Sequence, residues 1–196
     1  MKATVGKRIQ SCIDHMDKGE IELALSELCI AIDITSQKYF DTRKSSASVY
    51  KKFLKENMWI IMMTGTGNLI CPIKVKFSHP DIKSVDDFCN LEDIIYHVVR
   101  CELIHNTGEN SNIEWGQSSY PILSGPKGEL LLSTSFIWGV ILAVISSPVN
   151  KDEKVNELCW ISSLSFKYFI NDLWGRIDIV KRIAELHFGK SFLTNI

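Results

Sequence analysis

Apolar residues recur at helical spacing along most of this 196-residue chain. Positions three or four apart fall on one face of a helix, so each such stretch predicts a helix with a buried side. These stretches predict helices over residues 5–17, 20–40, 46–63, 91–104, 133–144 and 178–187. Residues 151–174 have near-helical spacing as well and predict one or two more helices. The pattern therefore predicts a mainly all-α fold, a helical bundle.

Alternation with a period of two, which is typical of strands, is confined to short stretches. In residues 69–77, Ile73, Val75 and Phe77 alternate with lysines, which predicts a short edge strand or an extended arm. Residues 113–115 and 129–132 lie in a segment rich in Gly, Ser, Asn and Pro and predict a strand pair. We therefore expect a small β-hairpin insertion between Gly108 and Ser133 in the helical bundle.

Length and composition indicate one globular domain over residues 1–196. Apolar residues make up 45% and charged residues 23%, and 22 basic against 23 acidic side chains give a net charge of −1. No general nucleic-acid footprint follows from that balance, so any RNA contact must be local. The six cysteines have no metal-binding spacing and there is no signal peptide, which predicts reduced thiols in a cytoplasmic protein. The longest apolar run, residues 136–145, is too short to span a membrane and predicts core or a dimer interface.

Residues 98–108 combine chemistry with a helix end. Arg100 and His105 are five positions apart, and Asn106-Thr107-Gly108 then ends the helix. On a straight α-helix Asp93, His97 and Arg100 share the polar side, while His105 lies about 140° round from Arg100. Glu102 falls within the apolar stripe, which predicts either a frayed turn or a carboxylate with a partner. One α-helix therefore cannot place Arg100 and His105 on the same small substrate.

The run Arg100-Cys101-Glu102-Leu103-Ile104-His105 resembles the Arg-x(4–6)-His signature of the HEPN superfamily. The likeness covers roughly residues 85 to 150 and includes Phe136-Ile137-Trp138-Gly139-Val140, which resembles the downstream part of an uncharacterised bacterial HEPN-like group. It implies a HEPN-like helical bundle and a metal-independent endoribonuclease in a toxin–antitoxin or defence setting. It also implies a homodimer with the site at its interface, single-stranded RNA as substrate, and an antitoxin or a nucleotidyltransferase as partner.

Under that resemblance His105 is the general acid and base and Arg100 clamps the phosphate, because imidazole titrates near neutral pH and guanidinium binds phosphate oxygens in a fork. Glu102, His97 and Asn106 are auxiliary candidates. We expect no cofactor, and no metal, because no ligand spacing is present. A second copy of the spacing, Arg182 to His187, is assigned to a solvated helix face.

Other interpretations stay open. Active HEPN members commonly carry Asn, Asp or His directly after the Arg, where this chain has Cys101. That difference favours a catalytically inactive module that binds nucleic acid, a nucleotide or a partner protein. A chance match in an unrelated helical interaction protein is the third class. In the simplest case His105 bonds to the following loop, and Arg100 pairs with Asp93 or another surface acid.

Overall fold

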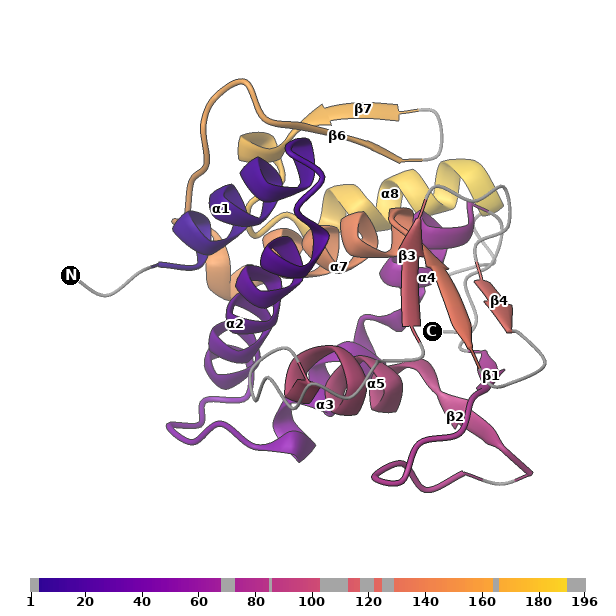
Figure 1. Ribbon diagram of the computed structural model, residues 1–196. Helices are drawn as coiled ribbons and strands as arrows, with labels where there is room; N and C mark the ends of the chain where they lie inside the picture. The colour runs from indigo at the N-terminus through magenta and orange to yellow at the C-terminus, as the bar shows by residue number, and fades with distance from the viewer. Residues whose placement is uncertain are drawn as a thin grey trace.

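The computed structural model describes residues 4–67, 73–84, 86–102, 113–116, 122–124, 129–163 and 166–189. Most of these residues are helical, as the sequence predicts, and short strands lie at the periphery (Figure 1). The helices are α1 (Val5–Asp17), α2 (Ile21–Tyr39), α3 (Ala47–Glu56), α4 (Met58–Thr66), α5 (Leu91–Ile94), the π-helix η1 (Ile95–Glu102), α7 (Ser135–Ser146), α8 (Ile177–Phe188) and the 3-10 turns η2 (Pro148–Asn150) and η3 (Ile170–Asp172).

Local signals place several helix ends. The Ser46 hydroxyl caps α3 by accepting a hydrogen bond of 3.2 Å from the Val49 backbone N–H. The single helix predicted over residues 46–63 is two helices, α3 and α4, which are separated at Asn57. The Asn57 side chain donates to the Phe53 carbonyl at 2.9 Å and thereby satisfies an acceptor at the end of α3. Gly67 ends α4 in the left-handed region, with φ of 72°.

The core is one apolar cluster around α7, which lies in the middle of the molecule (Figure 1). Nearly every residue from Phe136 to Ser146 is buried. This run was predicted to be core or a dimer interface, and within the single chain it is core, because α2 and α4 pack against it. Gly139 allows α4 to approach closely, since a methyl group at that position would lie 2.7 Å from the Ile61 carbonyl oxygen.

The strands form three small sheets among the described residues: β1 (Lys74–Lys76) with β2 (Phe88–Asn90), β3 (Ile113–Gly116) with β5 (Leu130–Ser133) and β4 (Ile122–Ser124), and β6 (Trp160–Ser163) with β7 (Phe166–Phe169). The predicted hairpin of residues 113–115 and 129–132 is wrong in topology. β3 and β5 are parallel, and β4 pairs antiparallel with β5 on the other side. Parallel neighbours cannot be joined by a tight turn, so the insertion is a three-stranded sheet rather than a hairpin.

The helices predicted over residues 151–174 are also wrong, because this stretch contains the antiparallel pair β6–β7. Ile161 and the half-buried Tyr168 face the core, whereas Trp160 and Phe169 are about half exposed. Aromatic and β-branched residues on a half-buried surface favour a strand. The pair lies over α1 and α8 at the end of the molecule opposite to α3 and α5 (Figure 1).

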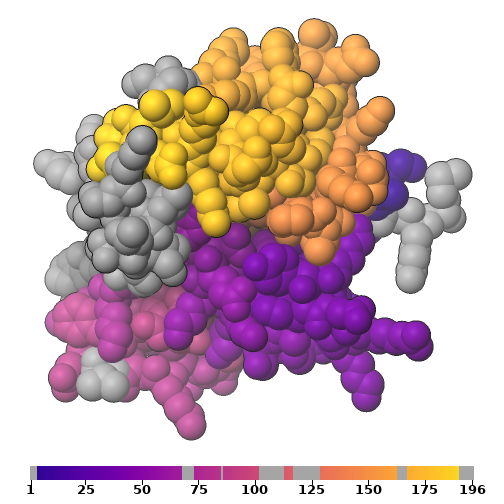
Figure 2. Space-filling view, turned by 180° about the vertical axis from the view of Figure 1, so that it is seen from behind, coloured from indigo at the N-terminus to yellow at the C-terminus, as the bar shows by residue number. Residues whose placement is uncertain are grey.

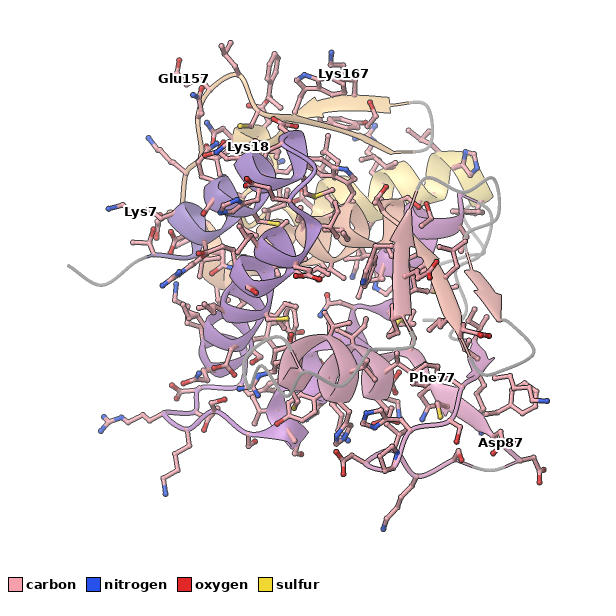
Figure 3. All side chains as sticks on the ribbon, in the orientation of Figure 1. Lys7, Lys18, Phe77, Asp87, Glu157 and Lys167 are labelled. Atoms are coloured by element: carbon pink, nitrogen blue, oxygen red, sulfur yellow. The ribbon has the colours of Figure 1, made fainter. Side chains whose placement is uncertain are left out.

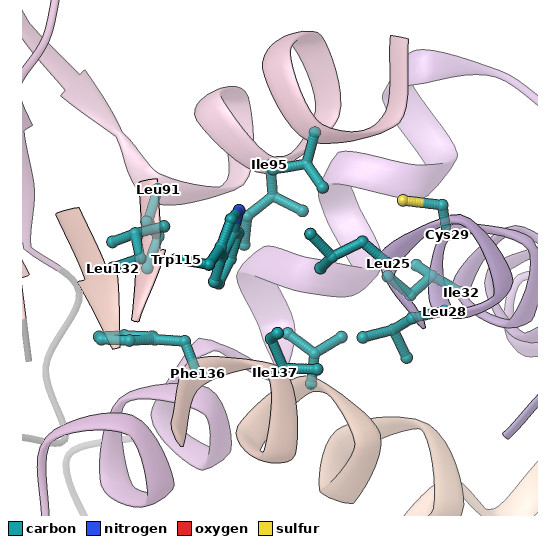
Figure 4. A pocket seen from close by; sticks show the side chains of 12 residues that line it. Leu25, Leu28, Cys29, Ile32, Leu91, Ile95, Trp115, Leu132, Phe136 and Ile137 are labelled. Atoms are coloured by element: carbon teal, nitrogen blue, oxygen red, sulfur yellow. The ribbon is translucent and has the colours of Figure 1, made fainter. Parts of the chain in front are cut away.

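From behind, the orange and yellow C-terminal segments cover the upper part of the surface, and the purple and magenta segments cover the lower part (Figure 2). Between these halves, α2, α5, η1, β3, β5 and α7 enclose a small apolar cavity of about 20 Å³ (Figure 4). Leu25, Ile95, Trp115, Leu132 and Ile137 are among its walls. Because its walls are apolar and it is about the size of one water molecule, it is a packing gap of the core rather than a ligand site.

Candidate functional site

The segment that carries Arg100 is a π-helix rather than an α-helix. α5 begins at Leu91, and from Ile95 to Glu102 the backbone forms the wider turns of a π-helix. The apolar side chains of the combined segment are buried as predicted: Leu91, Ile94, Ile95, Val98 and Val99. A π-helix has about 4.4 residues per turn and is frequent at functional sites. The pitch therefore changes which side chains of this segment are neighbours.

The wider π-helical turn moves Arg100 away from the polar side of the helix, where α-helical spacing predicted it to lie. Residues five apart differ by about 140° on an α-helix but by only about 50° on a π-helix. Arg100 is five positions after Ile95, which is buried, and it consequently lies beside the buried face and is itself half-buried. Asp93 is not its partner, because the Asp93 carboxylate pairs with Lys51 Nζ at 2.9 Å. The salt bridge considered for these two residues is absent.

Two tyrosine rings hold the Arg100 guanidinium. Its Cζ lies 5.1 Å from the Tyr96 ring centroid and 5.6 Å from the Tyr50 ring centroid, within the range of cation–π contacts. Tyr96 is one turn earlier in the same segment, and Tyr50 comes from α3. Arg100 Nε is buried and has no hydrogen-bond partner, and within the described part of the chain no carboxylate oxygen lies within ion-pair distance of Arg100. The guanidinium is therefore positioned by ring contacts and keeps its hydrogen-bond donors.

Charge around Arg100 favours its cationic form. Partial burial lowers the pKa of Arg100, but Tyr96 and the Asp33 carboxylate raise it by more, so the net shift is upward. Asp33, on α2, is engaged elsewhere, since it accepts hydrogen bonds from Ser45 Oγ at 2.6 Å and from Gln37 Nε2 at 3.3 Å. Arg100 is therefore a permanent cation whose neighbouring acid is already bonded.

Behind the guanidinium, Tyr50 and Cys29 form a buried floor. Tyr50 is fully buried, and burial raises the pKa of its hydroxyl well above the ordinary value. That hydroxyl faces the Cys29 thiol but has no hydrogen-bond partner of ordinary geometry. Burial likewise raises the pKa of Cys29 to about 11, although the Tyr50 contact and Arg100 lower it in part. Both groups are neutral near pH 7, so neither is a nucleophile or a base there.

A lysine-lined groove lies beside this segment. Its volume is about 560 Å³, and α3 contributes Lys51, Lys52 and Lys55 while α5 contributes Glu92 and Asp93. Lys51 Nζ is 5.9 Å from the Tyr96 ring centroid, so the Tyr96 ring contacts a lysine of the groove as well as Arg100. Burial raises the pKa of Glu92, and hydrogen bonds from Lys51 and Asn90 outweigh burial and lower the pKa of Asp93.

Only part of the predicted site is described by the structure. His97 is half-buried, and burial together with Lys51 lowers its pKa, which makes it neutral near pH 7. His105 and Asn106, as well as the Glu102 side chain, lie outside the described residues. The rejected second copy, Arg182 and His187, is exposed on α8 as predicted. Tyr50, Tyr96 and Lys51 were missed, although Tyr96 stands four positions before Arg100 and a helical pair at that spacing was detectable.

The described part of the chain has no group of three or more His, Cys, Asp or Glu that could hold a metal ion. Within the same residues, no helix is both long enough and apolar enough to cross a bilayer. The described cysteines are free thiols.

A family model named Rv1289 matches residues 4–194, nearly the whole chain. The chain belongs to the Rv1289 family. It is similar to the uncharacterized protein Rv1289 of Mycobacterium tuberculosis, at 22% identity over 95% of this chain and 90% of that protein. The uncharacterized protein Mb1320 of Mycobacterium bovis matches with the same identity and coverage. Neither the Rv1289 family description nor these names state an activity. No solved structure matches the chain significantly.

Proposed function

We propose that the chain binds single-stranded RNA at the surface formed by Arg100, Tyr96 and the lysines of α3. The observation that carries the proposal is the Arg100 guanidinium, which two tyrosine rings position and with which no described carboxylate forms an ion pair. A guanidinium with free donors binds phosphate oxygens as a fork. RNA-binding sites commonly pair such cations with aromatic rings on which unpaired bases stack.

The neighbouring groove supports this assignment, because its three lysines outnumber Glu92 and Asp93 and leave a local excess of positive charge on a chain whose net charge is −1. Lys52 and Lys55 are exposed on α3, while Lys51 reaches toward Tyr96. Exposed lysines contact phosphates without reading sequence, and each contact releases counterions. A strand of RNA that follows the groove would place its phosphates on the lysines and bring one phosphate to Arg100.

Metal-independent cleavage by Arg100 and His105 is the second candidate, with Arg100 as the phosphate clamp and His105 as the general acid and base. A HEPN-like fold, a homodimer with the site at its interface, and a toxin or defence role remain part of this candidate, which rests on the resemblance of residues 100–105.

Fluorescence anisotropy with a labelled 12-nucleotide single-stranded RNA tests the binding proposal. Arg100→Ala should weaken binding about tenfold or more, because a half-buried, preorganised cation would be lost. It should also lower the salt dependence by about one phosphate contact. Arg182→Ala removes the same charge from the exposed surface of α8 and is the matched control, with an expected change of less than about twofold. Equal affinity of Arg100→Ala and the unaltered protein would refute the proposal.

Cleavage is tested separately on the same RNA in EDTA. The second candidate predicts products with 2′,3′-cyclic phosphate ends and a rate about 100-fold lower in His105→Ala, the usual effect of losing a general acid–base. RNA binding should persist in that variant. Intact RNA after long incubation with the unaltered protein would eliminate cleavage and leave the binding proposal standing.

A further inference from the structure

A second groove lies at the opposite end of the molecule, between α1 and the β6–β7 pair. It has a volume of about 490 Å³ and runs beside one face of α1, on which Gln10, Asp14 and Asp17 stand. Gln10 joins its two walls, because Gln10 Oε1 accepts a 2.6 Å hydrogen bond from the Asn156 backbone N–H and Gln10 Nε2 lies 3.6 Å from Cys159 Sγ. Lys167, labelled in Figure 3, lies on β7 of this pair.

The edge of β6 that faces this groove has no strand partner among the described residues. In an antiparallel pair, alternate residues turn their backbone N–H and C=O groups toward the partner strand and away from it. Ile170 N–H donates to the Cys159 carbonyl at 3.0 Å, so Cys159 and Ile161 belong to the set that faces β7. Trp160 and Ser162 therefore direct their backbone groups to the open edge, and both residues line the groove.

The walls of the groove combine exposed apolar surface with unpaired acid. Leu158 is 79% exposed and Trp160 is 47% exposed, which are large values for such side chains. On α1, Asp14 and Asp17 are exposed, and neither forms an ion pair in the described part of the chain. Asp14 accepts only a neutral hydrogen bond, from Gln10 Nε2 at 2.8 Å. An open strand edge, apolar side chains and two carboxylates thus face the same space.

We propose that an extended segment of a partner protein, with alternating apolar and basic residues, adds to β6 as a third strand. Main-chain hydrogen bonds to Trp160 and Ser162 would supply affinity, as in other cases of strand addition. Apolar side chains of the segment would cover Leu158 and the part of Trp160 that Lys167, whose Nζ lies 3.5 Å from the Trp160 ring centroid, leaves exposed. Its lysines or arginines would pair with Asp14 and Asp17. The two carboxylates favour a basic peptide over RNA, whose phosphates they repel.

The test uses a labelled seven-residue peptide of alternating Lys and Val with blocked ends, and a Glu–Val peptide of the same length as control. The Lys–Val peptide should bind and the Glu–Val peptide should not. Ser162→Pro removes an outward N–H without breaking the β6–β7 ladder, since proline is tolerated on a strand edge. Its affinity for the peptide should fall about tenfold or more, whereas Ser162→Ala should match the unaltered protein.

Charge provides a variant that does not alter the backbone. The double variant Asp14→Asn and Asp17→Asn should weaken Lys–Val binding several-fold and make it less sensitive to salt. Arg100→Ala should leave peptide binding unchanged, which separates this site from the RNA proposal. Three results would overturn the inference: no peptide binding to the unaltered protein at millimolar concentration, equal binding by all variants, or self-association that Ser162→Pro abolishes. The last would assign the β6 edge to a second copy of the chain.

Discussion

Gly139→Ala tests whether close contact between α4 and α7 stabilises the core. Gly139 is buried in the middle of α7, and a methyl group there would lie 2.7 Å from the Ile61 carbonyl oxygen and 2.9 Å from Ile61 Cα. Both are backbone atoms of α4, so no rotamer change can relieve the clash. Ordinary carbon contacts are about 3.5–4.0 Å, and the two helices must therefore separate by roughly 1 Å.

Two opposing effects set the magnitude. Alanine is favoured over glycine inside a helix by about 1 kcal/mol. Against this, overpacking of a core costs about 1–3 kcal/mol, and we expect the upper end because the obstacle is backbone. A gap of that size also forfeits a quarter to a half of each dispersion contact along the interface. The net loss is about 2 kcal/mol, which for a chain of this length corresponds to a fall in Tm of about 4–8 °C.

Urea unfolding followed by circular dichroism measures this change directly. Gly116→Ala is the control, because its new methyl group would meet only Leu131 Cδ1 at 3.7 Å, an ordinary contact. That variant should unfold within about 0.5 kcal/mol of the unaltered protein. If Gly139→Ala were as stable as the unaltered protein or more stable, the close approach of α4 and α7 would be wrong, and helix propensity alone would decide the outcome.

Two further predictions follow from the pKa shifts. The pKa of Asp93 lies below its ordinary value of 3.8, because the hydrogen bonds from Lys51 and Asn90 outweigh the effect of burial. The ionised Asp93 therefore stabilises the folded protein fully above pH 3.8. This stabilisation is lost as the pH falls through the lowered pKa of the folded state. Asp93→Asn should therefore lose less stability than the unaltered protein between about pH 5 and 2, measured by urea unfolding; parallel curves would contradict this. The thiol of Cys29, whose pKa is about 11, should stay unmodified by iodoacetamide at pH 8 while the half-buried Cys159 reacts, because the thiolate is the reactive form. Peptide mass spectrometry would measure both modifications. Modification of Cys29 before Cys159 would show that Cys29 is not buried behind Arg100.

The helices could be predicted wherever one face is apolar. The bounds of α1 were predicted to the residue, and those of α2 and α8 to within one residue, because their buried positions repeat every three or four residues. The Ser46 cap was also recognisable from its residue type. The strands β6 and β7 could not be separated from helix by periodicity alone, since Trp160, Ile161, Tyr168 and Phe169 make an apolar cluster that suits either.

For the candidate site, the sequence pointed to Arg100 as a candidate residue but gave no indication of its surroundings. Tyr50 is fifty positions away and reaches Arg100 only because α3 packs against η1. Lys51, which pairs with Asp93 in place of Arg100, is nearly as far from Arg100 in the sequence as Tyr50 is. The π pitch itself has no marker among the residue types of Ile95–Glu102, which suit an α-helix, so tertiary packing decides it.

The π winding also lets this segment accommodate a one-residue difference in length. One residue removed from the segment between Ile95 and Arg100 would allow the backbone to return to α-helical winding. Residues four apart on an α-helix differ by about 40°, against about 50° for residues five apart on a π-helix, so the Arg100 guanidinium would keep its direction toward the two tyrosine rings. Relatives that lack one residue here would keep both the fold and this surface, so in an alignment a single-residue gap would mark a change of helical winding rather than the loss of the Arg100 position.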